Sequence, residues 1–514
     1  MRAESSQQTA DHAELLDRRR LLSLGLVGLG PKTERPVQGR FVDDSHELAH
    51  RLRDRTIRAL PKAEVRIPVV IVGAGIAGLS AAWWLERRGF RDFLLLELEK
   101  QPGGNSRWGE NEVSAYPWGA HYLPLPNQES TLVRELCREF GLLDAQGSWQ
   151  ERHLCHSPQE RLFLHGRWQE GLEPELGVTR KQRDQFRRFH EKMQQFRETR
   201  QFTLPMELGA KPSPLDRISF SEWLRQEGFD SPYLLWYVDY ACRDDYGSRA
   251  RDTSAWAGIH YFAARERAER GPLTWPEGNG WLVRKLLIKL AKYVRTQSMV
   301  GAIRRRQGRL SVEARETAYL AQAVIWAAPT FVLRYVFEEC PDTSGLTYSP
   351  WLTANLTLDR MPAERDSERA WDNVLFDSPA LGYVVATHQN LASRTERSVW
   401  TYYWALADQP PARIRQMLLE KDWHFWKEEI LRDLERAHPD IRQCVSRIDI
   451  LRLGHAMVRP YPGWIFGETR RRLLAWSSDI VLANSDLSGL SVFEEAQYRG
   501  VRAAERVLRR LGRT

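Results

Sequence analysis

A glycine-rich turn between two short apolar segments constrains this chain more than any other feature. Residues 67–72 (IPVVIV) form a β-branched run that indicates a buried parallel strand. The run leads directly into Gly73-Ala74-Gly75-Ile76-Ala77-Gly78. Residues 79–89 have helical periodicity and end in a glycine, and a second apolar segment at 93–96 precedes Glu97. This order of strand, Gly-x-Gly-x-x-Gly, helix and strand predicts a Rossmann-type dinucleotide-binding unit.

Each position of the turn has a physical role. Gly73 permits the tight turn out of the strand, Gly75 removes a side chain that would block a pyrophosphate, and Gly78 lets the helix pack close to the sheet. The helix N-terminus offers unpaired N–H groups and a positive dipole end to phosphates. Glu97 can accept hydrogen bonds from ribose hydroxyls. The predicted contacts to the dinucleotide are Gly73, Gly75, Ile76, Ala77, Gly78 and Glu97.

The residues that follow resemble the flavin-containing amine oxidase superfamily, which includes monoamine and polyamine oxidases, protoporphyrinogen oxidase and phytoene desaturases. Gly103-Gly104 follows Glu97 as the family's diglycine does, with Asn105 where the family has arginine and Arg107 two residues on. Residues 118–121 (WGAH) resemble the family segment that runs beside the flavin. The resemblance implies FAD as the cofactor. No cysteine occupies the position at which some relatives attach flavin covalently, so the FAD is expected to be non-covalent.

Later blocks follow in the family's order. Residues 278–282 (GNGWL) open a helix that reaches about 293, and a strand near 298–303 includes Val300, whose family counterpart holds the adenine through its backbone. Residues 323–329 resemble the strand and Ala-Pro that close this block. Near the C-terminus, residues 456–463 resemble a Pro-Tyr-Gly segment, and residues 479–508 resemble the last strand-to-helix unit beside the flavin. The resemblance therefore adds Gly103, Gly104, Asn105, Gly119, Ala120, Val300, Asp486, Gly489 and Val492 to the expected cofactor contacts.

The expected fold class is α/β, with a discontinuous Rossmann-type FAD-binding domain and an inserted α+β substrate domain. A chain of 514 residues exceeds one ordinary core, which favours two domains. The expected boundaries are a linker with one short helix at 31–66, the FAD-binding domain at 67–125, 275–345 and 450–514, and the substrate domain at 126–274 and 346–449, with helices at 183–198 and 411–435.

The N-terminus resembles a twin-arginine export signal. Residues 17–23 (DRRRLLS) precede a short apolar run at 24–30, far below the roughly 20 residues that a membrane-spanning helix needs. We expect residues 1–30 to be this signal in a periplasmic bacterial protein, because that route exports proteins already folded around a cofactor. An ordinary basic amphipathic segment in a cytoplasmic protein is the alternative. No other segment is apolar enough to span a membrane.

Composition limits the kinds of partner that this chain is expected to bind. The net charge of +8 is dispersed, without a stripe of basic and aromatic residues, which argues against nucleic acid. Five scattered cysteines have neither metal-ligand nor disulfide-framework spacing, so no metal site is expected. The expected partners are a small-molecule substrate and an electron acceptor, oxygen or another, for a monomer or homodimer.

For the chemistry, the leading hypothesis is oxidation of an amine, or of a related CH–NH or CH–CH bond, by hydride transfer to FAD. The alternatives are a desaturase or isomerase of a hydrophobic substrate, and a flavoprotein without turnover. Amine oxidases of the family hold a water against the flavin with a lysine on the strand expected here at 351–357, yet no lysine occurs from 293 to 420. His121 is the candidate catalytic residue, because imidazole titrates near neutral pH.

Two further groups of side chains are candidates for the substrate pocket. The acidic pair Asp244-Asp245 suits a cationic amine, whereas a solvated or arginine-paired cluster is the structural alternative. Aromatic residues can flank a flavin and orient an amine or a planar substrate, with packing in the core as the alternative. The aromatic candidates are Trp118, Tyr122, Tyr383, Tyr402, Trp404 and Trp464.

Overall fold

The computed structural model describes residues 36–43, 45–57, 61–266, 271–363, 368–390 and 396–513. The expected export signal at 1–30 lies outside these residues. Residues Gln38–Thr514 form one compact unit, and the elements named below belong to it.

The glycine-rich turn belongs to a five-stranded parallel sheet in the order β11-β4-β3-β15-β21. Every residue of β3 and β4 is buried, which explains why both strands read as continuous apolar runs. This sheet confirms the Rossmann-type unit expected from the sequence. Its strands are β3 (Val69–Val72), β4 (Phe93–Leu96), β11 (Val294–Arg295), β15 (Ala323–Trp326) and β21 (Ile480–Leu482).

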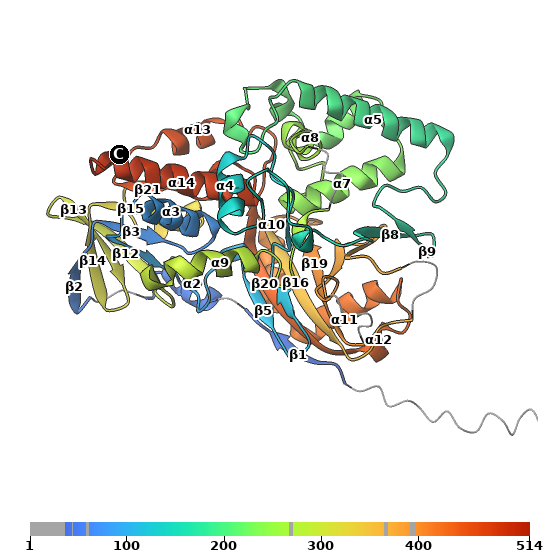
Figure 1. The fold of residues 1–514 in the computed structure, drawn as a ribbon, viewed down its shortest axis with the longest axis horizontal. Helices are drawn as coiled ribbons and strands as arrows, with labels where there is room; N and C mark the ends of the chain where they lie inside the picture. The colour runs from blue at the N-terminus through green and yellow to red at the C-terminus, as the bar shows by residue number, and fades with distance from the viewer. Residues whose placement is uncertain are drawn as a thin grey trace, which may run out of the picture. The chain divides into compact units, whose positions relative to one another are not determined.

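Two helices far apart in sequence pack side by side on this sheet. α3 (Ile76–Arg87) follows the glycine turn, and α14 (Phe493–Arg510) is the last helix of the chain (Figure 1). A Cβ on Gly500 would lie 2.0 Å from the carbonyl oxygen of Ala77, so only glycine allows the helices to approach this closely. Two helices far apart in the chain, α3 and α14, therefore belong to one layer against the parallel sheet.

A four-stranded sheet, ordered β12-β13-β14-β2, and the helix α9 (Gly280–Leu290) complete this part of the molecule. The strands are β2 (Ala63–Arg66), β12 (Val300–Arg306), β13 (Arg309–Ala314) and β14 (Thr317–Ala321). Smaller elements are β5 (Trp108–Glu110), β6 (Ala115–Pro117), β7 (Tyr122–Leu123), α4 (Thr131–Glu139), β10 (Leu273–Thr274) and the 3-10 turn η6 (Thr330–Tyr335).

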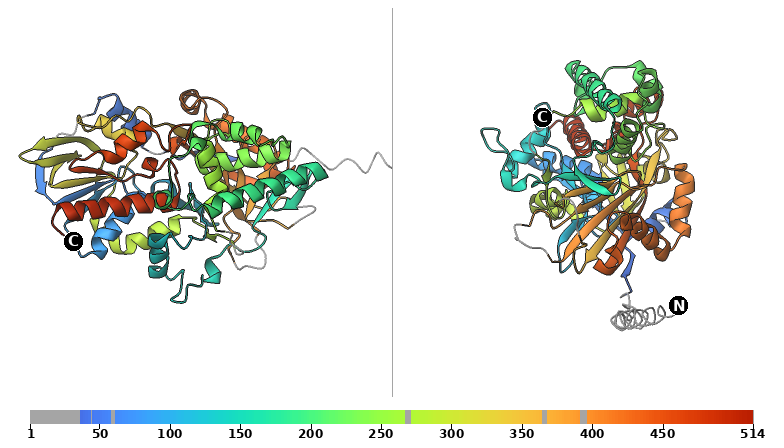
Figure 2. Two further views of the ribbon diagram at one scale, coloured as in Figure 1. Left: turned by 90° about the horizontal axis from the view of Figure 1, so that it is seen from above. Right: turned by 90° about the vertical axis from the view of Figure 1, so that its right-hand side faces the viewer.

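An eight-stranded mixed sheet forms the second large layer, in the order β1-β20-β16-β19-β18-β17-β8-β9. Figures 1 and 2 show α5, α7 and α8 on one side of this sheet and α11 and α12 on the other. Its strands are β1 (Gln38–Phe41), β8 (Glu160–Leu164), β9 (Arg167–Glu170), β16 (Tyr348–Leu358), β17 (Asp372–Leu375), β18 (Gly382–Val385), β19 (Ser398–Ala405) and β20 (Val445–Val458). The helices are α5 (Arg180–Glu198), α6 (Phe220–Gln226), α7 (Pro232–Tyr246), α8 (Ala255–Ala263), α10 (Pro411–Glu420), α11 (Trp423–Glu435) and α12 (Ile441–Cys444).

Three expectations about the organisation of the chain need correction. The segment 31–66, expected as a linker, contributes the edge strands β1 and β2 besides the helix α2 (His46–Arg53), because β1 pairs with β20 and β2 with β14. Residues 450–458, assigned to the FAD-binding domain, lie in β20 of the eight-stranded sheet. The single helix expected at 411–435 is two, since Lys421 is extended and the Asp422 side chain caps α11 by accepting from the Phe425 N–H.

No helix among the described residues is long and apolar enough to cross a membrane.

Candidate functional site

The glycine turn and Glu97 come together at the carboxyl ends of β3 and β4. Glu97 is 8% exposed, and its carboxylate accepts hydrogen bonds from the backbone N–H of Ala74 at 2.7 Å and of Glu99 at 2.8 Å. Burial raises the pKa of Glu97, which these two bonds oppose. Each carboxylate oxygen retains acceptor capacity for a further donor, such as a ribose hydroxyl.

The three glycines of the turn differ in the space around them. A Cβ on Gly73 would lie 2.7 Å from the Ala328 nitrogen, and one on Gly78 would lie 1.8 Å from the Gly73 carbonyl oxygen. A Cβ on Gly75 would have no neighbour closer than 3.9 Å. Gly73 and Gly78 are thus required by the fold itself, whereas the space above Gly75 is open. The first turn of α3 begins there without an acidic residue or a side-chain cap, so its N–H groups are available to phosphates.

The diglycine loop lies directly against Gly75. Gly103 forms a bridge with Gly75, and a Cβ on Gly104 would lie 3.2 Å from the Gly75 Cα. Arg107 donates from Nε to the Gly104 carbonyl at 3.0 Å, and its charge opposes the rise in the pKa of Glu97. Asn105, where relatives have arginine, instead donates to the Ala456 carbonyl at 2.7 Å. The cation beside this loop is therefore Arg107.

Two further expected cofactor contacts lie in different surroundings. Val300 begins β12 just after Ser298, whose backbone N–H donates to the Glu97 carbonyl at 2.7 Å, so Val300 lies near the Glu97 end of the crevice. Asp486 is 1% exposed and accepts from the backbone and hydroxyl of Thr330, both at 2.7 Å, and from the Tyr348 hydroxyl at 2.6 Å. Its carboxylate is held by these bonds inside the protein, and its contact to the cofactor stays a prediction.

A cavity of about 140 Å³, called here the central cavity, lies at Asn105, next to the diglycine loop. It brings together residues of the eight-stranded sheet and of the N-terminus of α14 with the segments around Asn105 and Gly119. Four expected cofactor contacts are among its lining residues: Asn105, Gly119, Ala120 and Val492. Gly489 lies just before α14, with φ of +80°, and a Cβ there would lie 2.6 Å from Trp464 Nε1. The cavity is also lined by His121, Tyr122, Pro124, Asp244, Asp245, Arg265, Asn279, Trp351, Thr353, Tyr403, Leu453, Ala456, Met457, Ser491, Phe493 and Glu494.

His121 faces the central cavity and stacks on Tyr403, with ring centroids 4.4 Å apart. Burial lowers the pKa of His121 to about 4, which a hydrogen bond to the Gly119 backbone opposes. The expected titration near neutral pH is therefore wrong, because the desolvated ring is neutral at pH 7. A neutral imidazole can still accept or donate a hydrogen bond to substrate.

Asp244 and Asp245 form the acidic part of the central cavity. Among the described residues, neither carboxylate has a hydrogen-bond donor or an ion-pair partner within reach. Burial, followed by mutual repulsion, raises the pKa of Asp244 to about 8, and burial raises that of Asp245 to about 6 although Arg265 opposes this. The arginine pairing offered as the structural alternative is present at Asp239, which pairs with Arg243 and Arg249. It does not extend to Asp244 and Asp245, since Arg265 pairs with Glu494 at 2.8 Å.

Two buried acceptors in the same cavity also lack donors. Asn279 is 2% exposed and donates to the Tyr122 carbonyl at 2.9 Å, but its Oδ1 has no partner among the described residues. Glu494 is 1% exposed, and its Oε2 is equally unpaired. Because unpaired buried acceptors are costly, this arrangement suits a ligand that brings N–H or O–H donors.

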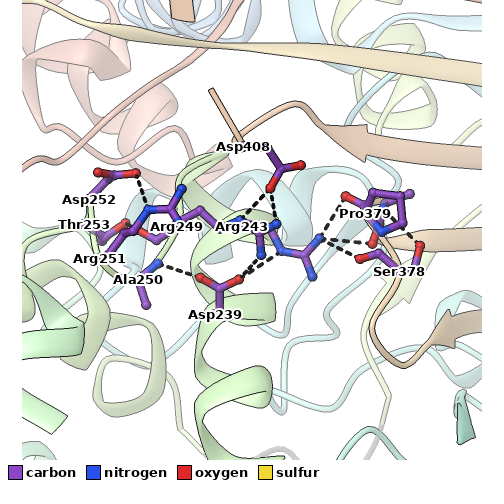
Figure 3. A network of polar contacts seen from close by, with 11 residues as sticks. Asp239, Arg243, Arg249, Ala250, Arg251, Asp252, Thr253, Ser378, Pro379 and Asp408 are labelled. Carbon is purple, nitrogen blue, oxygen red and sulfur yellow. Dashed lines mark hydrogen bonds and ion pairs between the residues drawn. The ribbon is translucent and has the colours of Figure 1, made fainter. Parts of the chain in front are cut away.

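A polar network fixes the end of α7 that carries the acidic pair (Figure 3). Arg243, 2% exposed, donates to the carbonyls of Ser378, Pro379 and Ala380 at 3.0–3.3 Å and lies 3.4 Å from the Asp239 carboxylate. Asp239 also accepts from the Ala250 N–H at 2.9 Å. These contacts connect the last turn of α7 to the loop that follows it and to the β17–β18 loop. They thereby hold Asp244 and Asp245 in place.

Most of the six aromatic candidates are packed in the core, which is the alternative stated for them. Of the six, only Tyr122 lines the central cavity. Tyr402 donates to Asp433 at 2.9 Å on the far face of β19, and Tyr403, its neighbour, faces the cavity with Trp351. Successive side chains of β19 point to opposite faces of the sheet, so only one of the two tyrosines can face the cavity. The sequence does not indicate which one, because residues 402–404 are all aromatic. The other candidates are packed in buried clusters: Trp118, Tyr383, Trp404 and Trp464.

The strand expected to carry the family's lysine is β16, as predicted. The β16 residues that face the cavity are Trp351 and Thr353, and Asn355, next on that face, donates to the Pro117 carbonyl at 3.2 Å. A threonine hydroxyl can hold a water by hydrogen bonding, without the positive charge of lysine. No cluster of three metal-ligating side chains exists within the described ranges, and all five cysteines are free.

Comparisons with known proteins agree with this geometry. Residues 71–140 match the family described as NAD(P)-binding Rossmann-like domain. An L-amino-acid oxidase of Daboia russelii is 32% identical over 123 residues, 24% of this chain and 23% of its own length. A 15-cis-phytoene desaturase of Narcissus pseudonarcissus is 32% identical over 101 residues, 19% of this chain and 17% of its own length. The chain thus spans less than a quarter of the length of these curated relatives.

Solved structures extend the likeness to the whole fold. A putrescine oxidase bound to putrescine matches 87% of this chain and 100% of its own, with a TM-score of 0.66 and 15% sequence identity. The chain therefore shares the fold of that putrescine oxidase, which here combines a Rossmann-type sheet with a second large sheet. With the local sequence matches, this likeness confirms the resemblance stated from the motifs and agrees with FAD as the cofactor.

Proposed function

We propose that this chain is an FAD-dependent oxidoreductase that oxidises a cationic amine. The observation that carries the proposal is the central cavity, in which the segment expected beside the flavin, Gly119-Ala120, meets the unpaired carboxylates of Asp244 and Asp245. An ammonium group would give these carboxylates the donors that the protein does not supply.

The crevice fits FAD along its length. Open space above Gly75 and the uncapped N-terminus of α3 would receive the pyrophosphate, with Arg107 beside it. Glu97 and the start of β12 would hold the adenosine, and the N-terminus of α14 would face the flavin end. When bound there, FAD supplies the acceptor for a hydride.

The protein's own side chains bind, orient and desolvate the substrate. Asp245, helped by Asp244, binds the ammonium group, and the aromatic rings of Tyr403 and Trp351 confine its carbon skeleton and exclude water. Burial keeps the ring of His121 neutral, and this ring can accept a hydrogen bond from the substrate nitrogen and so orient it.

A second candidate is desaturation or isomerisation of a hydrophobic substrate. Thr353 in place of a cavity-facing lysine, and the phytoene desaturase among the relatives, favour it. The acidic pair opposes it, since a lipophilic substrate would leave two half-buried carboxylates without donors. A flavoprotein without turnover is a third candidate, which rests on no contact in the structure.

Anaerobic mixing of the purified, FAD-loaded protein with separate substrates distinguishes the candidates. Amine oxidation predicts that polyamines or aromatic amines bleach the visible flavin absorption. Bleaching by lipophilic polyenes alone would support the desaturase. Reduction by dithionite alone would support a protein without turnover.

Export is a further part of the proposal. The twin arginine at 18–19, followed by a short apolar run, supports transport of the folded, FAD-loaded protein to a bacterial periplasm. The transported protein would be a monomer or a homodimer. Fractionation of cells that express the full chain and its Arg18→Lys, Arg19→Lys variant tests this. Equal recovery of both from the periplasm, or of both from the cytoplasm, would exclude the signal.

A further inference from the structure

A second, larger cavity lies on the opposite face of the eight-stranded sheet from the central cavity. Its volume is about 640 Å³, within the range of small-molecule sites. Residues of β20 separate the two cavities, because Leu453, Ala456 and Met457 line the central cavity whereas Arg452, Gly454 and His455 line this one. Its walls come from α2, η6, α10 and the end of β20. We call it the arginine-lined cavity.

The charge of this cavity is almost entirely positive. Five arginines and three histidines line it, against the single carboxylate of Asp43, which is already paired with Arg452. Arg53 pairs with Asp54 outside the cavity. The remaining basic residues on its wall are His46, His50, Arg334, Arg415, His455 and Arg459.

Two of these arginines have no acidic partner within the part of the chain that the structure describes. Arg415 reaches only the carbonyls of Tyr348 and Gly454, both at 3.5 Å, and burial lowers its pKa. Arg334 donates to the hydroxyl of Tyr335 at 2.8 Å. Both guanidinium groups thus retain donors suited to a carboxylate, sulfonate or phosphate.

His455 shows how concentrated the positive charge is. Burial lowers the pKa of His455 to about 4, and the nearby charges that add to this are Arg415, His50, Arg53 and Arg334, all of them cations. Its ring stacks on Phe331, with centroids 4.8 Å apart. A neutral imidazole and an aromatic ring therefore form an apolar wall next to the arginines.

Further apolar side chains extend that wall. Leu419 is 56% exposed and Leu346 and Leu418 are buried beside the same space. An exposed leucine next to unpaired arginines suits a ligand with one anionic group and an apolar body.

We propose that the arginine-lined cavity binds a small organic anion with an aromatic or aliphatic body. The anionic group is held by Arg334 and Arg415, and the body packs on Phe331, His455 and the leucines. The site is separate from the proposed amine site, so it does not depend on the proposed oxidase activity.

Fluorescence titration with a matched pair of dyes tests this. The first dye, 8-anilinonaphthalene-1-sulfonate, is an apolar sulfonate, and the second, N-phenyl-1-naphthylamine, is its uncharged counterpart. The FAD-loaded wild type is expected to bind the sulfonate at least about tenfold more tightly than the neutral dye, because a charge-assisted bond to arginine is lost without the sulfonate.

Variants locate the binding. The double variant Arg334→Gln, Arg415→Gln is expected to bind the sulfonate about tenfold or more weakly, and Arg334→Gln alone, at an exposed position, to show part of that loss. The control Arg413→Gln lies on the same helix, donates only to Gln416 and does not line the cavity, so it should bind as the wild type does. Equal affinity for the two dyes, no binding of the sulfonate, or unchanged affinity in the double and single variants would each overturn the proposal.

Discussion

Arg265 and Glu494 form an ion pair of 2.8 Å across the central cavity, joining the end of α8 to the first turn of α14. Arg265 is the only arginine or lysine among the described residues lining this cavity. Its guanidinium group is paired with the Glu494 carboxylate. Asp244 and Asp245 are consequently left without a full counter-charge next to the expected flavin position. The proposed recognition of an amine depends on this relationship.

Removing the carboxylate of Asp245 should weaken amine binding selectively. We expect Asp245→Asn to lower kcat/KM for an amine by about 10- to 100-fold, which corresponds to roughly 1.4–2.8 kcal/mol of lost charge-assisted binding. FAD content should not change. Asp184→Asn, on the exposed face of α5, is the matched control. An amine kcat/KM equal to that of the wild type would exclude this carboxylate from recognition.

The pH dependence of amine binding follows from the raised pKa values. Burial and mutual repulsion raise the apparent pKa values of this interacting pair to about 6 and about 8, and only the ionised forms attract an ammonium. Affinity should therefore increase as pH rises from about 5 to about 8, while the amine itself remains charged. His121, with a pKa of about 4, should add no step in this range. A decrease in affinity over this range, measured as the dissociation constant at each pH, would contradict the assignment.

Replacing Gly75 or Gly78 by alanine should have different effects on stability and on FAD binding. Gly78→Ala places a Cβ 1.8 Å from a carbonyl oxygen, so we expect destabilisation of about 1–3 kcal/mol or more. Gly75→Ala meets open space and should leave the apo-protein's unfolding midpoint unchanged, but weaken FAD binding because the methyl group occupies the pyrophosphate position. Gly89→Asn, at a left-handed position with nothing within 4 Å, is the control. Normal FAD affinity in Gly75→Ala would show that the phosphates lie elsewhere.

The network at the end of α7 should matter for stability and for substrate. Arg243→Met leaves the buried carbonyls of residues 378–380 without their donor, and we expect a loss of about 1–3 kcal/mol in the free energy of unfolding. Because α7 carries Asp244 and Asp245, KM for the amine should rise while FAD content is retained. Denaturant unfolding and steady-state kinetics of the same preparation measure both effects. An unchanged KM would mean that the network stabilises the helix without positioning the acids.

The cofactor crevice was predictable from the sequence because its requirements are local. The spacing of Gly73, Gly75 and Gly78 between apolar strands reflects backbone contacts that any such turn must make, and Glu97 follows at the end of the next strand. Residue roles set by distant contacts were not predictable. For example, nothing in the sequence indicates that the carboxylate of Asp486 bonds to Thr330 and Tyr348.

The substrate side was less predictable, for a different reason. Tyr402 and Tyr403 are chemically alike, and only the register of β19 against β16 and β18 decides which one faces the cavity. The neutral state of His121 depends on burial by Tyr403 and Trp371, which are far away in sequence. The polar segment 31–66 has weak periodicity, because edge strands such as β1 need little apolar sequence when a longer strand pairs with them.

The most direct test of the account is whether the purified chain holds FAD in this crevice. The expected result is a yellow protein that releases FAD on heating, rebinds it stoichiometrically, and becomes colourless in the double variant Gly75→Val, Glu97→Ala while remaining folded. A wild-type protein that shows no isoalloxazine absorption and does not take up added FAD, or a double variant that keeps its colour, would contradict it.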